Sequence, residues 1–81
     1  MKIRVKLFAV AREWAGSDCV ELDVPGAATA GAAREALIMR IPNLSRFGAQ
    51  LRLAVNNDFA DDKTPISAEC EIACIPPVSG G

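Results

Sequence analysis

The sequence predicts an α+β domain in which a mixed sheet of four to five strands is covered by one main helix. Several short segments alternate apolar and polar residues, as half-buried strands do, and one segment between them carries apolar residues at helical spacing. With 81 residues, the chain is too short for a doubly wound sheet or a second domain. One helix lying across one mixed sheet is therefore the economical arrangement.

Two strands are expected at the start of the chain. The first alternates over residues 2–8. Its apolar set is Ile3, Val5 and Leu7, and its basic set is Lys2, Arg4 and Lys6. Phe8 has the parity of the basic set, so its ring is expected on the outer face of the sheet. Residues 9–15 predict a single helical turn, and Trp14 within it is expected to cover the edge of the core. Residues 19–24 alternate again and predict a second strand that pairs with the first.

The main helix is predicted from Thr29, a good N-cap, to about Ile41, where Pro42 prevents continuation. Its apolar stripe follows helical spacing: Ala30, Ala33, Leu37 and Ile41. A right-handed crossover through this helix is expected to place the third strand parallel to one of the first pair.

The second half of the chain predicts two or three more strands. Residues 43–50 are expected to be a connecting loop in which Leu44 and Phe47 cover the end of the helix. Residues 51–56 alternate as a third strand and are followed by turn chemistry at residues 56–58. Residues 59–60 predict a short strand, and residues 71–75 predict the last one.

Composition excludes several classes of function. Nine basic and ten acidic residues give a net charge of −1, which provides no strong field for nucleic acid or an anionic membrane. The chain has no histidine, so imidazole acid–base catalysis must come from a partner, and no metal site is expected. Three cysteines without CxxC spacing predict neither a disulfide framework nor a closed zinc site, so a reducing cytoplasm fits best. No stretch is long and apolar enough to span a membrane.

The last six residues are expected to work outside the domain formed by residues 1–75. They read Pro76, Pro77, Val78, Ser79, Gly80 and Gly81. Two prolines favour an extended, stiff spacer, and two glycines without Cβ atoms can pass through a channel that other side chains would block. The tail is therefore expected to be inserted into a partner, with the carboxylate of Gly81 as its reacting group.

Three motifs carry a resemblance to a known family. They are the opening stretch of residues 7–16, the strand end Ala54-Val55-Asn56 and the close of residues 76–81. Together they resemble the MoaD-type sulfur carriers, the small subunits of molybdopterin synthase, whose fold is the ubiquitin-like β-grasp. The resemblance spans the chain but departs from the family at residues 67–70, where an Asp-Gly-Asp turn is usual and this chain has no glycine.

The resemblance implies a function as a cosubstrate that is not catalytic alone. A separate ubiquitin-activating-like adenylyltransferase would adenylate Gly81 with ATP, a sulfur-donating enzyme would convert it to a thiocarboxylate, and no cofactor would bind this chain. The large synthase subunit would then receive the tail in a heterotetramer, and the sulfur would pass to a pyranopterin precursor. The family's partner-binding patch maps to Phe8, Phe59 and Ile75, with Arg12 available to pair with an acid of the partner.

Other functions fit parts of the same pattern. A sulfur carrier for thiamine or another thio-product, a ubiquitin-like modifier joined to lysines, and a plain interaction module are the alternatives. The complete Pro-Pro-Val-Ser-Gly-Gly close favours the molybdopterin carrier.

Overall fold

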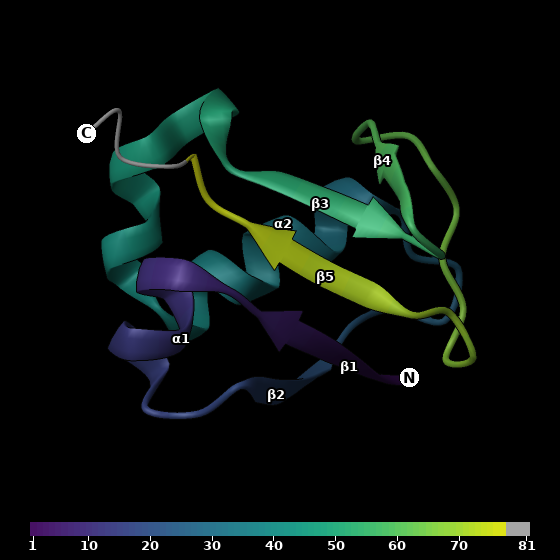
Figure 1. Cartoon of the computed structure of the whole chain (residues 1–81). Coiled ribbons are helices and arrows are strands. Elements are labelled where there is room, and N and C mark those ends of the chain that lie inside the picture. Colours follow the sequence, from purple (N-terminus) through teal and green to yellow (C-terminus); the bar gives the residue numbers. More distant parts are fainter. Residues whose placement is uncertain (78–81) are drawn as a thin grey trace.

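A computed structural model describes residues 1–77 and shows five strands, one long helix and two shorter helical segments (Figure 1). In chain order these are β1 (Lys2–Leu7), α1 (Ala9–Ala15), β2 (Cys19–Asp23), α2 (Ala30–Arg40), the 3-10 helix η1 (Pro42–Gln50), β3 (Arg52–Val55), β4 (Asp58–Ala60) and β5 (Ile72–Ile75). The predicted α+β class, with one main helix across a mixed sheet, is confirmed. Within these residues no helix is long and apolar enough to cross a membrane.

The sheet has the strand order β2-β1-β5-β3-β4. β1 is antiparallel to β2 and parallel to β5, and β3 is antiparallel to both β5 and β4. β3 therefore runs in the same direction as β2, but it pairs with neither of the first two strands, because β5 lies between β1 and β3. All four residues of β5 are apolar, which suits a strand paired along both edges.

The core lies between the sheet and α2. The predicted stripe of the helix is buried, with Ala33 and Leu37 at 0 % exposure, and the apolar set of β1 faces it. The side chain of Thr29 caps the helix by accepting a hydrogen bond from the N–H of Ala32 at 3.4 Å. Small alanines on the buried side let the helix lie close to the sheet.

The predicted loop at residues 43–50 is wrong, because this segment is the 3-10 helix η1, which is interrupted by a kink at Gly48 with φ of 54° and ψ of −130°. Pro42 stands at its start, where a missing N–H costs nothing. Leu44 and Phe47, three residues apart, then fall on one side; Leu44 is fully buried, and the ring of Phe47 stacks on Trp14 with centroids 5.7 Å apart. The expectation that these two side chains cover the end of α2, and that Trp14 covers the edge of the core, is confirmed.

α1 covers the same seven residues that were predicted to form a single helical turn. It ends at Gly16, whose φ of 72° is the left-handed conformation common at helix C-termini. The N–H of Gly16 donates to the carbonyls of Arg12 and Glu13 at 3.0 and 3.3 Å, so the last turn is closed by the backbone alone.

Two turns of the second half follow different rules. Asn56 and Asn57 form a two-residue hairpin between β3 and β4 with φ of 53° and 73°, as a type I′ turn requires. The glycine-free turn at residues 67–70 is closed by a 3.2 Å bond from the N–H of Cys70 to the carbonyl of Ser67, and none of its residues has a positive φ. The departure from the family pattern is thus met by a turn type that needs no glycine.

Candidate functional site

The three residues predicted for the partner-binding patch lie on the face of the sheet opposite α2. Register aligns one row of outward residues across all five strands: Cys19, Lys6, Ala73, Ala54 and Phe59. In the next row Arg52 pairs with Ile75, and Phe8 follows Leu7, which pairs with Cys74. We call Phe8, Ala54, Phe59, Ala73 and Ile75 the outer-face patch.

The patch exposes large apolar side chains that a soluble protein normally buries. Phe8 is 48 % exposed and Phe59 is 59 % exposed, while Ile75 is half-buried. The prediction from strand parity that Phe8 faces outward is confirmed. Full burial of such a side chain against a partner contributes about 1.5–3 kcal/mol, so the patch can offset the entropy lost when a tail is ordered in that partner.

Basic side chains surround the patch. The guanidinium of Arg52 lies 4.2 Å from the centroid of the Phe59 ring, a cation–π contact that holds both side chains. Arg12 is exposed in the last turn of α1. Arg52 was missed by the sequence reasoning, although its outward parity beside Ala54 and the short hairpin to Phe59 could have indicated it. The proposed pairing of Arg12 with a partner's acid stays a prediction.

The tail begins where β5 ends. Pro76 is buried and Pro77 is half-buried, so the packed part of the chain extends past the predicted boundary at residue 75. The root of the tail is thus held by the domain, beside Ile75 of the outer-face patch. The four other residues assigned to the tail, Val78, Ser79, Gly80 and Gly81, lie outside the described residues.

The thiols differ in environment. Burial raises the pKa of Cys74 to about 12, so this thiol is inert. Cys70 lies in the turn before β5, and its pKa is lowered mainly by the Ser67 hydroxyl at 3.5 Å and the Ser67 N–H at 3.4 Å, with the Asn56 amide at 3.8 Å adding to the effect. The fold brings these hydrogen-bond donors together, and no motif in the sequence indicates them.

No group of three or more metal-ligating side chains gathers anywhere within residues 1–77. The Cys70 thiol is surrounded by hydrogen-bond donors from its own turn and from Asn56. Among the described residues, the outer-face patch is the candidate site.

Comparison with known proteins agrees with this arrangement. The chain matches the ThiS family over residues 5–81. It is 33 % identical over 81 residues to the molybdopterin synthase sulfur carrier subunit of Arabidopsis thaliana, covering all of this chain and 84 % of that protein. It is 39 % identical over 84 residues to small archaeal modifier protein 1 of Haloferax volcanii, covering 94 % and 97 % of the two chains.

Solved structures share the fold. The crystal structure of the Haloferax volcanii protein superposes with a TM-score of 0.84 at 37 % identity and full coverage of both chains. In a complex of subunits 1 and 2 of molybdopterin-converting factor from Helicobacter pylori, one chain superposes with a TM-score of 0.65 at 22 % identity, again over both full chains. The fold is therefore the predicted ubiquitin-like β-grasp, and the chain belongs to the ThiS family of ThiS/MoaD-type sulfur carriers.

Proposed function

We propose that this chain is the sulfur-carrying small subunit of a molybdopterin synthase. The observation that carries the proposal is the outer-face patch, with Phe8 and Phe59 exposed beside the strand that leads into the Pro-Pro-Val-Ser-Gly-Gly close. The similarity to the plant carrier subunit supports it. The patch would dock on the large subunit, with Arg12 pairing with an acid there, and Val78–Gly81 would enter its active site, giving a heterotetramer.

The chemistry needs three partners. An adenylyltransferase would join an oxygen of the Gly81 carboxylate to the α-phosphorus of ATP, releasing pyrophosphate. A sulfur-donating enzyme would then supply sulfide sulfur to the acyl carbon, and AMP would leave with the bonding pair. The thiocarboxylate sulfur would attack the pyranopterin precursor in the large subunit, and water would regenerate the carboxylate. This histidine-free chain supplies only the carboxyl group, so cationic and acid–base groups belong to the partners.

A second candidate function is a ubiquitin-like modifier joined to lysines of other proteins. It is favoured by the 39 % identity to small archaeal modifier protein 1. The same acyl adenylate serves both functions, because an amine can displace AMP as well as sulfur can. The two differ in the product: a thiocarboxylate on Gly81 in one and an isopeptide bond in the other.

The test removes the reacting residue. Deleting Gly81, or adding one alanine after it, should abolish ATP–pyrophosphate exchange by the activating enzyme, while the intact chain acquires one sulfur in place of one oxygen. Mass spectrometry of protein purified together with its neighbouring proteins detects either the thiocarboxylate or a lysine conjugate. Undiminished exchange with the altered C-terminus would rule out Gly81 as the reacting residue.

We place the carrier in the cytoplasm because its three cysteines are free thiols.

A further inference from the structure

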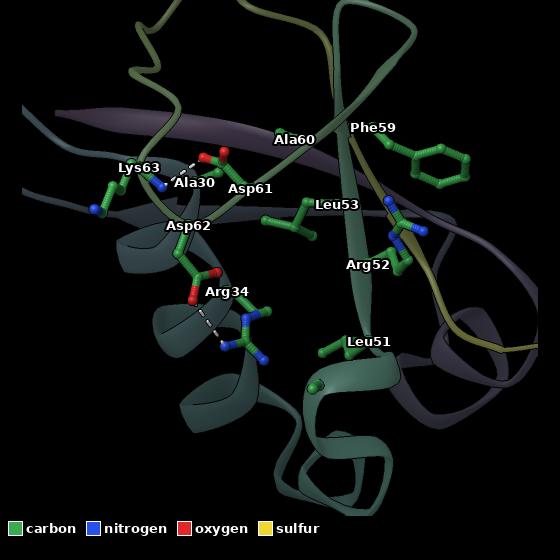
Figure 2. A pocket seen from close by; sticks show the side chains of 11 residues that line it. Ala30, Arg34, Leu51, Arg52, Leu53, Phe59, Ala60, Asp61, Asp62 and Lys63 are labelled. Atoms are coloured by element: carbon green, nitrogen blue, oxygen red, sulfur yellow. Dashed lines mark hydrogen bonds and ion pairs between the residues drawn. The ribbon is translucent and has the colours of Figure 1, made fainter.

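A notch opens at the sheet edge where β4 leaves β3. The two strands pair only from Leu53↔Ala60 to Val55↔Asp58, so the beginning of β3 has no strand beside it on that edge. A cavity of about 730 Å³ lies there, between β3, the loop at residues 61–63 and α2 (Figure 2). Leu51 and Leu53 line it on one side, and Arg34 of α2 with Asp62 lines it on the other.

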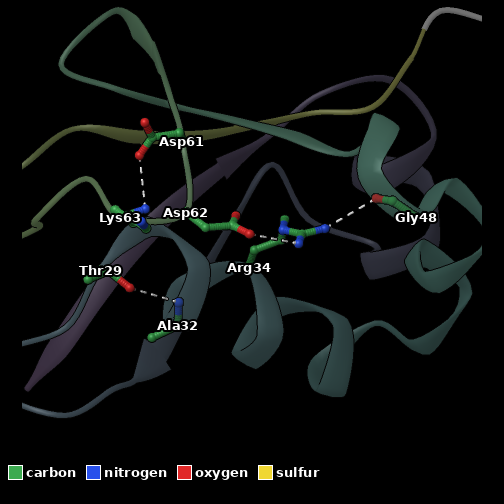
Figure 3. Close-up of polar contacts among 7 residues, drawn as sticks. All are labelled: Thr29, Ala32, Arg34, Gly48, Asp61, Asp62 and Lys63. Atoms are coloured by element: carbon green, nitrogen blue, oxygen red, sulfur yellow. Dashed lines mark hydrogen bonds and ion pairs between the residues drawn. The ribbon is translucent and has the colours of Figure 1, made fainter.

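Arg34 crosses this notch with an incompletely used guanidinium. Its Nη1 donates to the carbonyl of Gly48 at 3.2 Å, and its Nη2 donates to Oδ2 of Asp62 at 3.4 Å (Figure 3). Its Nε is buried and has no hydrogen-bond partner among residues 1–77. Nε–H and Nη2–H form a fork that one carboxylate can fill with both oxygens. Here Asp62 contacts only Nη2, so half of the fork is used and the buried Nε–H has no acceptor within residues 1–77.

The Asp62 side chain is a replaceable partner of this fork. Its backbone is fixed, because its carbonyl accepts the N–H of Gly31 at 3.0 Å and its Cβ lies 3.0 Å from where a Cβ on Gly31 would stand. The side chain itself is 67 % exposed, against 24 % for Arg34. An exposed carboxylate in one long contact gains little from that contact, so rotation of the Asp62 carboxylate away from Nη2 costs little.

The charges of the lining favour an anion. The lining residues include three basic ones, Arg34, Arg52 and Lys63, and two acidic ones, Asp61 and Asp62, which gives a net charge of +1. The Asp61 carboxylate is occupied within its own loop by the N–H of Lys63 at 2.9 Å and the hydroxyl of Thr64 at 3.3 Å. The notch also shares Phe59 and Arg52 with the surface that presents the outer-face patch.

We propose that this notch receives an aspartate or glutamate side chain of the protein that docks on the outer-face patch. Arg34 binds the incoming carboxylate with Nε and Nη2, and Asp62 is the carboxylate that it displaces. The inference rests on the proposed function for the source of the carboxylate, which is the large synthase subunit. The anion receptor itself is built from residues of this chain alone.

The first experiment tests the receptor without any partner. The Arg34 Nε–H resonance of the ¹⁵N-labelled chain is followed during titration with the blocked peptide acetyl-Ala-Glu-Ala-amide at constant ionic strength, and with its glutamine analogue as control. We expect a saturable shift of this resonance with the glutamate peptide only. An unmoved resonance, or equal shifts with both peptides, would overturn the proposal.

Two matched variants separate displacement from general charge effects. Asp62→Ala removes the internal competitor and should tighten glutamate-peptide binding at least threefold, whereas Asp61→Ala makes the same change in net charge and should have a smaller effect. Equal gains from both variants, or no gain from Asp62→Ala, would mean that Asp62 does not occupy the receptor. A purely structural Arg34–Asp62 contact predicts lower stability without tighter binding.

The second experiment uses the large subunit. Arg34→Lys keeps the charge but lacks the fork and should weaken the complex about tenfold, and Asp62→Ala should strengthen it. Affinity unchanged by Arg34→Lys in a complex that forms would exclude the notch from the interface. If the wild-type chain does not bind the large subunit at all, the proposed function fails, and the peptide titration still decides whether the notch is a carboxylate receptor.

Discussion

Asn56 shows how much of the structure one side chain can determine. It adopts a left-handed conformation with φ of 53° in the hairpin between β3 and β4. Its N–H donates to the carbonyl of Glu71 at 2.8 Å, and its Oδ1 accepts the N–H of Glu71 at 2.9 Å. Through these two bonds the hairpin turn also fixes the chain that leads into β5, and with it the turn that holds Cys70.

Two substitutions at Asn56 separate its backbone role from its side-chain role. Asn56→Gly keeps the left-handed conformation and loses only the side-chain bonds to Glu71 and Cys70, whereas Asn56→Ala loses the same bonds and adds the steric cost of a positive φ. We expect Asn56→Ala to be less stable than Asn56→Gly by about 1–2 kcal/mol in urea unfolding. Equal stability of the two variants would show that the left-handed conformation at this position costs nothing.

Cys74 should make stability fall at high pH. Its pKa is raised by burial from 9.0 to about 12, so above pH 9 the unfolded chain loses the thiol proton while the folded chain keeps it, and unfolding is favoured. At pH 10 this effect is on the order of 1 kcal/mol. The unfolding midpoint should therefore fall less between pH 7 and pH 10 in Cys74→Ala than in the wild type.

Cys70→Ser is the matched control, because Cys70 is hydrogen-bonded in a turn and its pKa is lowered. In the wild type, the Cys70 thiol loses its proton at a lower pH in the folded chain than in the unfolded chain, so this thiol adds stability as the pH rises toward 9. A pH dependence that is the same in Cys74→Ala and the wild type would contradict the assignment.

For single residues, the sequence predicted most of the exposed side chains of the candidate site. Parity alone placed Phe8 outward, because a side-chain period of two leaves no alternative once Ile3, Val5 and Leu7 face the core. Parity says nothing about Cys70, which shares the parity of Ile72 but lies before β5 begins. Parity has meaning only inside a strand, and the donors around Cys70 come from positions 14 and 3 residues away.

The contact between α2 and the loop at residues 61–64 is a feature of whole elements. The first N–H groups of the helix are satisfied by this loop, through the carbonyl of Thr64 to Ala30 at 2.8 Å and the carbonyl of Asp62 to Gly31 at 3.0 Å. Gly31 permits that approach, because a Cβ there would lie 3.0 Å from the Asp62 carbonyl oxygen.

Gly31→Ala should therefore destabilise the protein. Helix propensity alone predicts a gain of about 1 kcal/mol, but the loop must move away from the new methyl group, and such overpacking costs about 1–3 kcal/mol. Thermal unfolding of Gly31→Ala measures the balance, and Ala36→Gly in the same helix calibrates the propensity effect. A stabilised Gly31→Ala variant would show that the loop adapts freely.

Elements with one clear period were predictable, and elements defined by distant partners were not. The stripe of α2 and its N-cap at Thr29 are local, so the helix was placed within a residue of its ends. The helical segment η1 was missed because its signal is a single apolar pair, Leu44 and Phe47, whose partners lie elsewhere in the chain.

For the whole molecule, strand order was the part that sequence could not supply. The apolar strand β5 is the last in sequence, yet it lies at the centre of the sheet and pairs with β1 in parallel. Pairing of that kind depends on the packing of the complete sheet and leaves no local pattern. It has a functional consequence, because a central β5 brings Ile75 between Phe8 and Arg52 and starts the tail in the middle of the exposed face.

The outer-face patch gives the last prediction. Phe8→Asp should weaken binding of the large subunit at least tenfold, which is about 1.4 kcal/mol, because a carboxylate in an apolar contact loses its hydration. The same change should alter the stability of the isolated chain by about 0.5 kcal/mol or less, since Phe8 is 48 % exposed.

Met39→Asp is the matched control for this variant. Met39 is an even more exposed large apolar residue, at 83 %, but it lies on α2, which covers the opposite face of the sheet. Calorimetric binding and thermal unfolding measured on the same samples should show weaker binding only for Phe8→Asp. If both variants bind equally well, docking does not use the outer face; if Phe8→Asp unfolds, its ring belongs to the core, and its exposure in the free chain does not mark a docking surface.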